Sequence, residues 1–311
     1  MTQLRFDGRT AIVTGAGGNP SIGRAHALLL AARGANVIVN DIGRTVAPGY
    51  AGVASADEVA AEIRAAGGNA VADSHSVATE GGARGIVQTA IDTFGRLDIL
   101  INNAGISIAA EFDEMTADDI RQHIDINLMG TIWTCRAAWP HMKAQGYGRI
   151  VNTSSGAFGG VPLLAAYSAS KGGVFSFSRA LAGEGSAHGI KVNTLNPGAF
   201  SRMVAAQQTD TSSMYQLCKV NLPADLVAPV AAWLSHEDCP STGETITAVG
   251  GEVARVHIAQ TSGFTDKPLT LEAVAERWKD VLAGAPNGLI PFAANDPREW
   301  EMKPYIAAER F

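Results

Sequence analysis

The chain has 311 residues, of which 46 % are hydrophobic and 17 % are charged. That composition supplies a large apolar core and excludes an intrinsically disordered protein. The formal net charge is −6 and no run of lysines and arginines occurs, which argues against nucleic-acid binding. The three cysteines, Cys135, Cys218 and Cys239, lack the spacing of a disulfide framework or a metal site. We therefore expect a globular, cytoplasmic protein that holds no metal.

The sequence offers no segment for membrane insertion. Residues 1–9 are polar and lead directly into a predicted strand. The longest purely apolar run, residues 27–32, is far shorter than the roughly 18 residues that a membrane-spanning helix needs. We expect neither a signal peptide nor a membrane span.

Short β-branched or apolar runs alternate with segments of helical periodicity along most of the chain. Strands that are apolar on both faces and separated by helices indicate a parallel sheet covered on both sides. The predicted class is therefore α/β, with a Rossmann-type doubly wound sheet of seven parallel strands. The predicted strands are 11–14, 36–40, 70–72, 99–101, 150–153, 191–195 and 245–249, and the predicted helices are 22–33, 55–66, 82–94, 116–142, 165–188 and 224–235.

Two segments fall outside this alternation. Residues 199–222 are polar in the middle, and a loop of this length in a compact domain is usually functional, so we interpret it as a substrate lid. The tail from residue 254 to 311 holds one helical pattern, 271–283, followed by proline-rich coil. The predicted organisation is one domain over residues 1–253, which includes the lid, and a C-terminal arm over 254–311 that packs on the body or on a partner subunit.

A glycine-rich run follows the first predicted strand and opens the first helix. Glycines allow close approach of a pyrophosphate, and the free N–H groups of a helix N-terminus attract it. The predicted contacts are Gly15, Gly17, Ser21, Ile22 and Gly23.

The second predicted strand ends at an acidic residue, Asp41. A carboxylate there accepts hydrogen bonds from the ribose hydroxyls and repels a 2′-phosphate, which predicts NAD rather than NADP. Arg44 lies nearby and leaves recognition of a 2′-phosphate open.

Tyr167 and Lys171 stand four residues apart and so share one face of a predicted helix. An ammonium close to a phenol favours the phenolate and lowers its pKa, which suits a group that exchanges protons near neutral pH. The pair predicts an acid/base function for Tyr167.

Together these motifs resemble the short-chain dehydrogenase/reductase family, in the family's order over about 250 residues. The matching segments are 14–23, Asn102-Asn103-Ala104-Gly105, Asn127, Ser154-Ser155, Tyr167 with Lys171, and Asn196-Pro197-Gly198. The resemblance implies that Asn127, Ser155, Tyr167 and Lys171 are catalytic and that Tyr167 and Lys171 also contact the cofactor. It further implies cofactor contacts from Ser76, Val77, Asn103, Ala104, Gly105, Pro197 and Gly198.

The family spacing leaves two serines as candidates for polarising the substrate oxygen. Counting from the strand at 150–153 and from Asn127 favours Ser155, whereas counting back from Tyr167 favours Ser154. A deletion in the loop 156–164 is less disruptive than one inside a strand, where it would reverse every side chain. We therefore prefer Ser155.

A closer resemblance to the (3R)-hydroxyacyl-CoA dehydrogenase unit of the type 2 peroxisomal multifunctional enzymes lies in segments 135–150, 201–203, 226–239 and 270–278. It implies NAD-dependent oxidation of 3-hydroxyacyl-CoA in lipid metabolism, by a homodimer or homotetramer. Oxidation of a steroid or other bulky secondary alcohol is the alternative, and an inactive NAD-binding scaffold is a remote one. The spacing of Tyr167 and Lys171 argues against an enoyl reductase. Arg202 is a candidate contact for a CoA phosphate.

Overall fold

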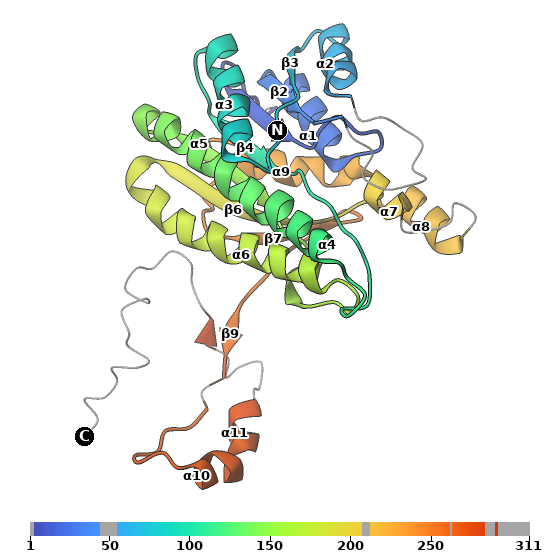
Figure 1. Cartoon of the computed structure of the whole chain (residues 1–311). Coiled ribbons are helices and arrows are strands. Elements are labelled where there is room, and N and C mark those ends of the chain that lie inside the picture. The colour runs from blue at the N-terminus through green and yellow to red at the C-terminus, as the bar shows by residue number, and fades with distance from the viewer. Residues whose placement is uncertain (1–2, 44–54, 207–211, 262, 284–289, 292–311) are drawn as a thin grey trace. The chain divides into compact units, whose positions relative to one another are not determined.

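The computed structural model describes residues 3–43, 55–206, 212–261, 263–283 and 290–291 (Figure 1). Contacts between residues divide the chain into two units, Met1–Arg255 and Val256–Phe311. Each unit is described by itself.

The first unit is built around one sheet with the strand order β3-β2-β1-β4-β5-β6-β7-β8. Strands β1 to β7 are parallel, as predicted. The prediction of seven strands is wrong by one, because β8 pairs antiparallel with β7. The bounds are β1 Thr10–Thr14, β2 Asn36–Asn40, β3 Asn69–Asp73, β4 Ile99–Asn102, β5 Gly148–Thr153, β6 Ile190–Gly198, β7 Thr245–Val249 and β8 Glu252–Arg255.

A glycine pair explains the additional strand. Gly250 and Gly251 connect β7 to β8 with φ values of 57° and 89°. A two-residue hairpin turn with positive φ at both positions matches the twist of the strands it joins, and glycine adopts this conformation without steric cost. The chain therefore reverses direction after β7.

Helices cover both faces of the sheet (Figure 1). Buried side chains of α1, α2 and α9 share one core cluster with the strand residues Ala11 and Val13. Those of α3, α5 and α6 share a second cluster with Ile12, on the opposite face. The bounds are α1 Ile22–Ala32, α2 Ala56–Ala65, α3 Glu80–Phe94, α4 Ala117–Gln122, α5 Gly130–Gln145, α6 Ala165–Gly185, α7 Arg202–Ala206, α8 Ser213–Asn221 and α9 Ala228–Ser235.

The predicted long helix over residues 116–142 is not a continuous α-helix. A π-helical segment, His123–Met129, joins α4 to α5. Such segments are rare and are frequent at functional sites. This one holds Asn127, whose side chain is completely buried.

The predicted lid, residues 199–222, is more regular than the expected loop. It contains α7 and α8, and Ser212 caps α8 by accepting a hydrogen bond from the N–H of Tyr215. The ring of Phe200 packs edge-on against that of Tyr215, with 5.0 Å between centroids. Residues 207–211, within the predicted lid, lie outside the described residues.

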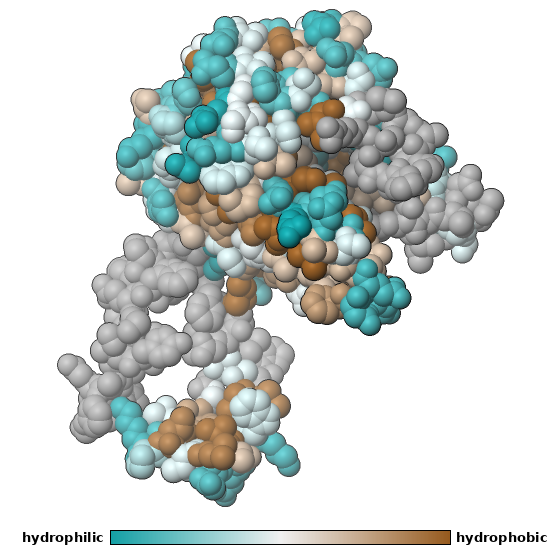
Figure 2. Space-filling model, in the orientation of Figure 1, coloured by the Kyte–Doolittle hydropathy of each residue, from teal (hydrophilic) through white to brown (hydrophobic). Residues whose placement is uncertain are grey.

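The second unit contains short elements only. They are β9 (Ala259–Gln260), which pairs antiparallel with β10 (Ile290–Pro291), α10 (Leu271–Glu276) and α11 (Trp278–Leu282). The single helix predicted over 271–283 is interrupted at Arg277, whose backbone has φ −99° and ψ 13°. Exposed apolar side chains gather on this unit (Figure 2), namely Leu269, Leu271, Trp278 and Leu282. Packing of this arm on the body or on a partner stays a prediction.

None of the described helices is, by itself, long and apolar enough to cross a bilayer. The segments Tyr215–Asn221 and Ala224–Ser235, bent by 45°, satisfy the length and composition requirement only as a pair.

Candidate active site

The glycine-rich loop after β1 lies against the carboxyl end of β4. Gly15 has φ 64°, and a Cβ added there would come within 2.8 Å of the Cα of Ala104. A Cβ added at Gly23 would lie 2.5 Å from the side-chain nitrogen of Asn103. Only glycine allows these approaches, so two of the predicted cofactor-binding glycines are required by packing alone.

Polar contacts join the same two strand ends. The Thr14 hydroxyl oxygen accepts hydrogen bonds from the N–H groups of Asn103 and Ala104, each at 3.0 Å. The Asn103 amide donates to the carbonyl oxygens of Thr14 and Gly15 at 2.9 and 3.1 Å. Strand order reverses between β1 and β4, and ligands of doubly wound sheets bind in the crevice at that point.

The N-terminus of α1 opens into this crevice. Ser21 caps the helix, its hydroxyl accepting a hydrogen bond from the N–H of Arg24 at 3.2 Å. The first turn, which begins with Ile22 and Gly23, carries no acidic side chain. The free N–H groups and the partial positive charge of a helix N-terminus favour an anion there.

Asp41 lies beside the glycine loop with its side chain 9 % exposed. Its two carboxylate oxygens accept hydrogen bonds from the N–H groups of Gly17 and Gly43, each at 3.0 Å. Each carboxylate oxygen retains a lone pair for a further donor. Arg44, the other candidate at this position, lies outside the described residues.

Tyr167 and Lys171 occupy the first two turns of α6; Lys171 is buried and Tyr167 is partly buried. The Lys171 nitrogen lies 5.7 Å from the centre of the Tyr167 ring and donates a hydrogen bond to the carbonyl oxygen of Thr153 at 2.8 Å. Lys171 is only 3 % exposed, and burial lowers its pKa to about 8. Removal from water disfavours the charged ammonium, which is the cause of this shift.

The pKa of Tyr167 shifts in the opposite direction from the one predicted. Burial raises it above the ordinary value, and a hydrogen bond with the Ser155 hydroxyl opposes that rise. In this structure the group that lowers the pKa of Tyr167 is therefore Ser155 rather than Lys171. The physical reason is that burial of the phenol outweighs the effect of its neighbours.

The two candidate serines have different surroundings. Ser155 is partly exposed, lowers the pKa of Tyr167, and accepts a hydrogen bond from the N–H of Ala157 at 3.2 Å. Ser154 is 1 % exposed, and its hydroxyl donates to the carbonyl oxygen of Lys171 at 2.8 Å. Only Ser155 combines contact with Tyr167 and access to solvent.

Asn127 connects the π-helical segment to the loop after β4. Its amide oxygen accepts from the N–H of Ile106 at 2.8 Å, and its amide nitrogen donates to the carbonyl oxygen of Ile106 and to the hydroxyl of Ser170. A Cβ added at Gly105 would lie 3.0 Å from the Asn127 oxygen and 3.5 Å from the Lys171 nitrogen. The loop after β4 thus touches the glycine loop at one end and Asn127 and Lys171 at the other.

The remaining predicted contacts lie at the ends of other strands. The Ser76 hydroxyl accepts from the N–H of Ala78 at 3.2 Å, and Val77 is buried in the core beside Gly130. Pro197 and Gly198 end β6, where Gly198 packs against β7. Their contacts with a dinucleotide stay predictions.

Sequence reasoning assigned no individual role to three polar residues of this region. Thr14 joins the strand ends, Ser170 hydrogen-bonds Asn127, and the ring of His123 lies edge-on to that of Tyr167 at 6.2 Å. The position of Thr14 immediately before the first glycine was a usable signal. Nothing in the sequence indicated the π-helical segment that brings His123 close to Tyr167.

The arrangement fits a dinucleotide. Gly15 and Gly23 keep the loop free of side chains, α1 presents its N-terminus, and Asp41 supplies a carboxylate for a ribose. Among the described residues no group of three or more His, Cys, Asp or Glu side chains could hold a metal ion. The glycine loop, the N-terminus of α1 and Asp41 would hold the phosphates and a ribose of such a dinucleotide.

Comparison with known proteins establishes the family. The sequence profile for short chain dehydrogenases matches residues 9–213. The chain is a short-chain dehydrogenase. Members of this family are oxidoreductases that act on CH–OH groups and typically use NAD or NADP.

Relatives of this short-chain dehydrogenase include larger enzymes. Mouse peroxisomal multifunctional enzyme type 2 is 42 % identical over 284 residues, covering 89 % of this chain and 37 % of the mouse protein. The full-length Drosophila melanogaster enzyme matches with TM-score 0.79 and 30 % identity, over 99 % of this chain and 50 % of that one. The dehydrogenase therefore spans about a third to a half of these multifunctional proteins.

A short chain dehydrogenase from Mycobacterium avium, whose crystal structure is known, is similar over its full length. It shares 34 % identity and a TM-score of 0.76, over 94 % of this chain and 99 % of that chain.

The buried amine of Lys171 predicts a pH-dependent stability. Because its folded pKa of about 8 lies below the ordinary 10.5, the unfolded chain binds more protons between these values, so stability rises with pH across that window. From about pH 7.5 to about pH 9.5, the wild type should gain about 2 kcal/mol in unfolding free energy relative to Lys171→Met. Urea denaturation measures the difference, with exposed Lys143→Met as control. If the unfolding free energy of Lys171→Met rose as much as that of the wild type over this pH range, the lowered pKa of a buried amine would be contradicted.

Proposed function

We propose that this short-chain dehydrogenase oxidises the hydroxyl group of 3-hydroxyacyl-CoA to a ketone and uses NAD. The observation that carries the proposal is the position of the buried Lys171, whose nitrogen lies 5.7 Å from the centre of the Tyr167 ring and close to Gly105 of the loop that touches the glycine-rich crevice. The Ser155 hydroxyl, which lowers the pKa of Tyr167, completes the group. The name of the mouse and Drosophila relatives, peroxisomal multifunctional enzyme type 2, supports a substrate of this class.

The side chains divide the reaction between them. The bound dinucleotide supplies the hydride acceptor. Ser155 would donate a hydrogen bond to the substrate oxygen as this becomes a carbonyl, and Tyr167, as the phenolate, would take the proton that the hydroxyl group releases. Lys171, held by the carbonyl of Thr153, lies with its nitrogen 5.7 Å from the centre of the Tyr167 ring and would contact the ribose of the coenzyme.

Apolar side chains near Tyr167 support a substrate with a hydrocarbon portion. Val161 and Leu163 are 42 % and 47 % exposed and directly precede α6, the helix of Tyr167. Phe112 is 72 % exposed, and its loop is joined to Leu163 by a hydrogen bond from the Ala110 N–H to the Leu163 carbonyl at 3.0 Å. Leu163 has φ 67°, the one positive value outside glycine among the described residues. Such strained positions cluster at ligand-binding sites.

Location and assembly stay predictions. The sequence predicts a cytoplasmic homodimer or homotetramer, whereas the multifunctional relatives carry the word peroxisomal in their names. Both compartments are compatible with a chain whose three cysteines are free in the structure.

Removing the phenol oxygen tests the acid/base role. Tyr167→Phe should lower turnover of 3-hydroxyacyl-CoA by at least about 100-fold, because general acid–base catalysis contributes this much. Tyr147→Phe is the matched control, because the Tyr147 ring packs against Arg9 and Arg149, which lie outside the proposed site. Retention of more than a few per cent of wild-type turnover by Tyr167→Phe would contradict the proposed mechanism.

Neutralising Asp41 tests the coenzyme preference. Asp41→Asn removes the charge that would repel a 2′-phosphate and weakens the acceptor for ribose hydroxyls, so the ratio of kcat/KM for NAD to that for NADP should fall by about 10- to 100-fold. Steady-state kinetics with both coenzymes measures the ratio, and Asp92→Asn on α3 is the control. An unchanged ratio would show that coenzyme choice is made elsewhere.

A further inference from the structure

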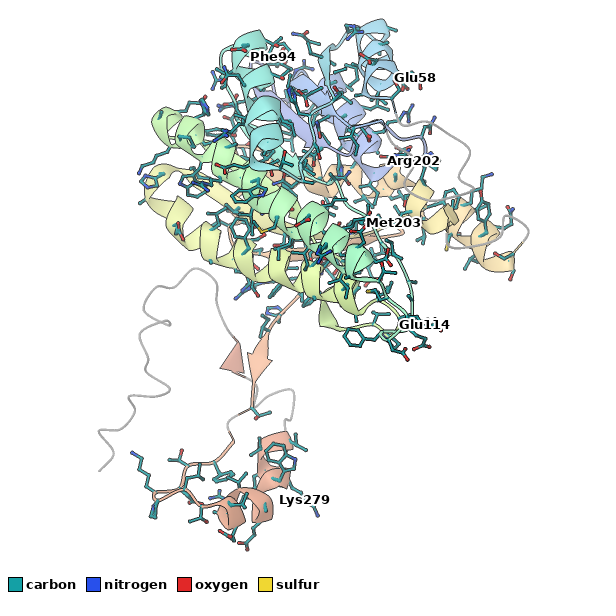
Figure 3. The ribbon with its side chains drawn as sticks, viewed as in Figure 1. Glu58, Phe94, Glu114, Arg202, Met203 and Lys279 are labelled. Atoms are coloured by element: carbon teal, nitrogen blue, oxygen red, sulfur yellow. The ribbon has the colours of Figure 1, made fainter. Side chains whose placement is uncertain are left out.

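Arg202, the first residue of α7, lies directly over the glycine-rich loop (Figure 3). Its N–H donates a hydrogen bond to the carbonyl oxygen of Pro20 at 3.3 Å. A Cβ added at Gly18 would come within 2.6 Å of the central carbon of the guanidinium group. The lack of a side chain at Gly18 therefore creates the space that the guanidinium fills.

The guanidinium is buried with an incomplete set of partners. Arg202 is 9 % exposed, and its Nη1 has no hydrogen-bond partner among the described residues. Its Nη2 lies 4.0 Å from the nearest oxygen of Asp41, which is too far for a hydrogen bond. A buried cation with unused donors is costly, and buried charges are normally paired. This arginine is therefore suited to an additional anion.

We propose that Arg202 binds the pyrophosphate of the dinucleotide. The inference rests on the proposed use of NAD and adds a phosphate ligand from outside the glycine-rich loop. Guanidinium groups bind phosphate oxygens through paired N–H donors. The first turn of α1 carries no acidic side chain that would repel those oxygens.

The surroundings favour the pyrophosphate over two other phosphates. A 2′-phosphate on the ribose would face the carboxylate of Asp41, which lies between the Gly17 N–H and the Arg202 guanidinium. The phosphates of CoA belong to the substrate, whereas Arg202 lies against Gly18 and Pro20 of the cofactor loop. The contact with a CoA phosphate that the sequence suggested is thus replaced by one with the coenzyme.

Binding measurements test this assignment without catalysis. NADH binding is followed by its fluorescence, and ADP-ribose and adenosine are used as competitors in the wild type, Arg202→Gln and Arg202→Lys. Arg202→Gln should weaken NADH and ADP-ribose by about 10- to 100-fold, the effect of losing a charge-assisted hydrogen bond, and should leave adenosine unchanged. Arg202→Lys should recover part of the loss. Lys219→Gln, the control, removes a positive charge on α8 that is close to Arg202 in the sequence. This variant should bind NADH and ADP-ribose as tightly as the wild type.

The outcomes separate this proposal from the proposed function. ADP-ribose binding within twofold of the wild type in both Arg202 variants would overturn the assignment, as would a loss confined to NADPH or to the KM for a CoA ester. An equal loss in Lys219→Gln would also overturn it, since a general effect of charge would then explain the result. A wild type that binds ADP-ribose but oxidises no hydroxyacyl-CoA would overturn the substrate class alone. A wild type that binds neither NADH nor ADP-ribose would overturn both.

Discussion

The contact between the ends of β1 and β4 is the constraint on which the site depends. The Thr14 hydroxyl accepts the N–H groups of Asn103 and Ala104, while glycine at position 15 permits the backbones to touch. From there the chain reaches Gly105, which lies against Asn127 and Lys171. A displacement at the strand ends would therefore move the proposed coenzyme loop and the proposed catalytic side chains relative to each other. Hydride transfer requires these two groups to be aligned, because reacting atoms must approach within about 3.5 Å.

Two buried basic side chains, Lys171 and Arg202, place positive charge at the crevice, although the chain as a whole has a net charge of −6. Lys171 and Arg202 are both at least nine-tenths buried. Lys171 donates a hydrogen bond to the backbone carbonyl of Thr153. The Arg202 guanidinium lies 4.0 Å from the carboxylate of Asp41, which is too far for a hydrogen bond. Unfavourable burial of this kind clusters at functional sites, where it is offset by a ligand of opposite charge. A dinucleotide with two phosphates is such a ligand.

Much of this arrangement could be predicted from the sequence, since periodicity reports which faces are buried. The seven parallel strands followed from runs apolar on both faces, and the separation of Tyr167 from Lys171 placed both on one helix face. The additional strand β8 was missed even though Gly250-Gly251 is a hairpin signal. The π-helical segment and the position of Arg202 depend on tertiary contacts, which a local pattern does not encode. The pKa of Tyr167 likewise depends on burial, which spacing alone does not reveal.

The most direct test of the account is the oxidation of a racemic 3-hydroxyacyl-CoA by the purified chain, followed by the absorbance of NADH. We predict turnover with NAD, much slower turnover with NADP, and a reaction that stops when half of the racemate, the (3R) form, has been consumed. Free steroid alcohols assayed in parallel should react poorly. A chain that oxidises steroids or other free alcohols but no acyl-CoA would retain the chemistry of Tyr167 and contradict the proposed substrate.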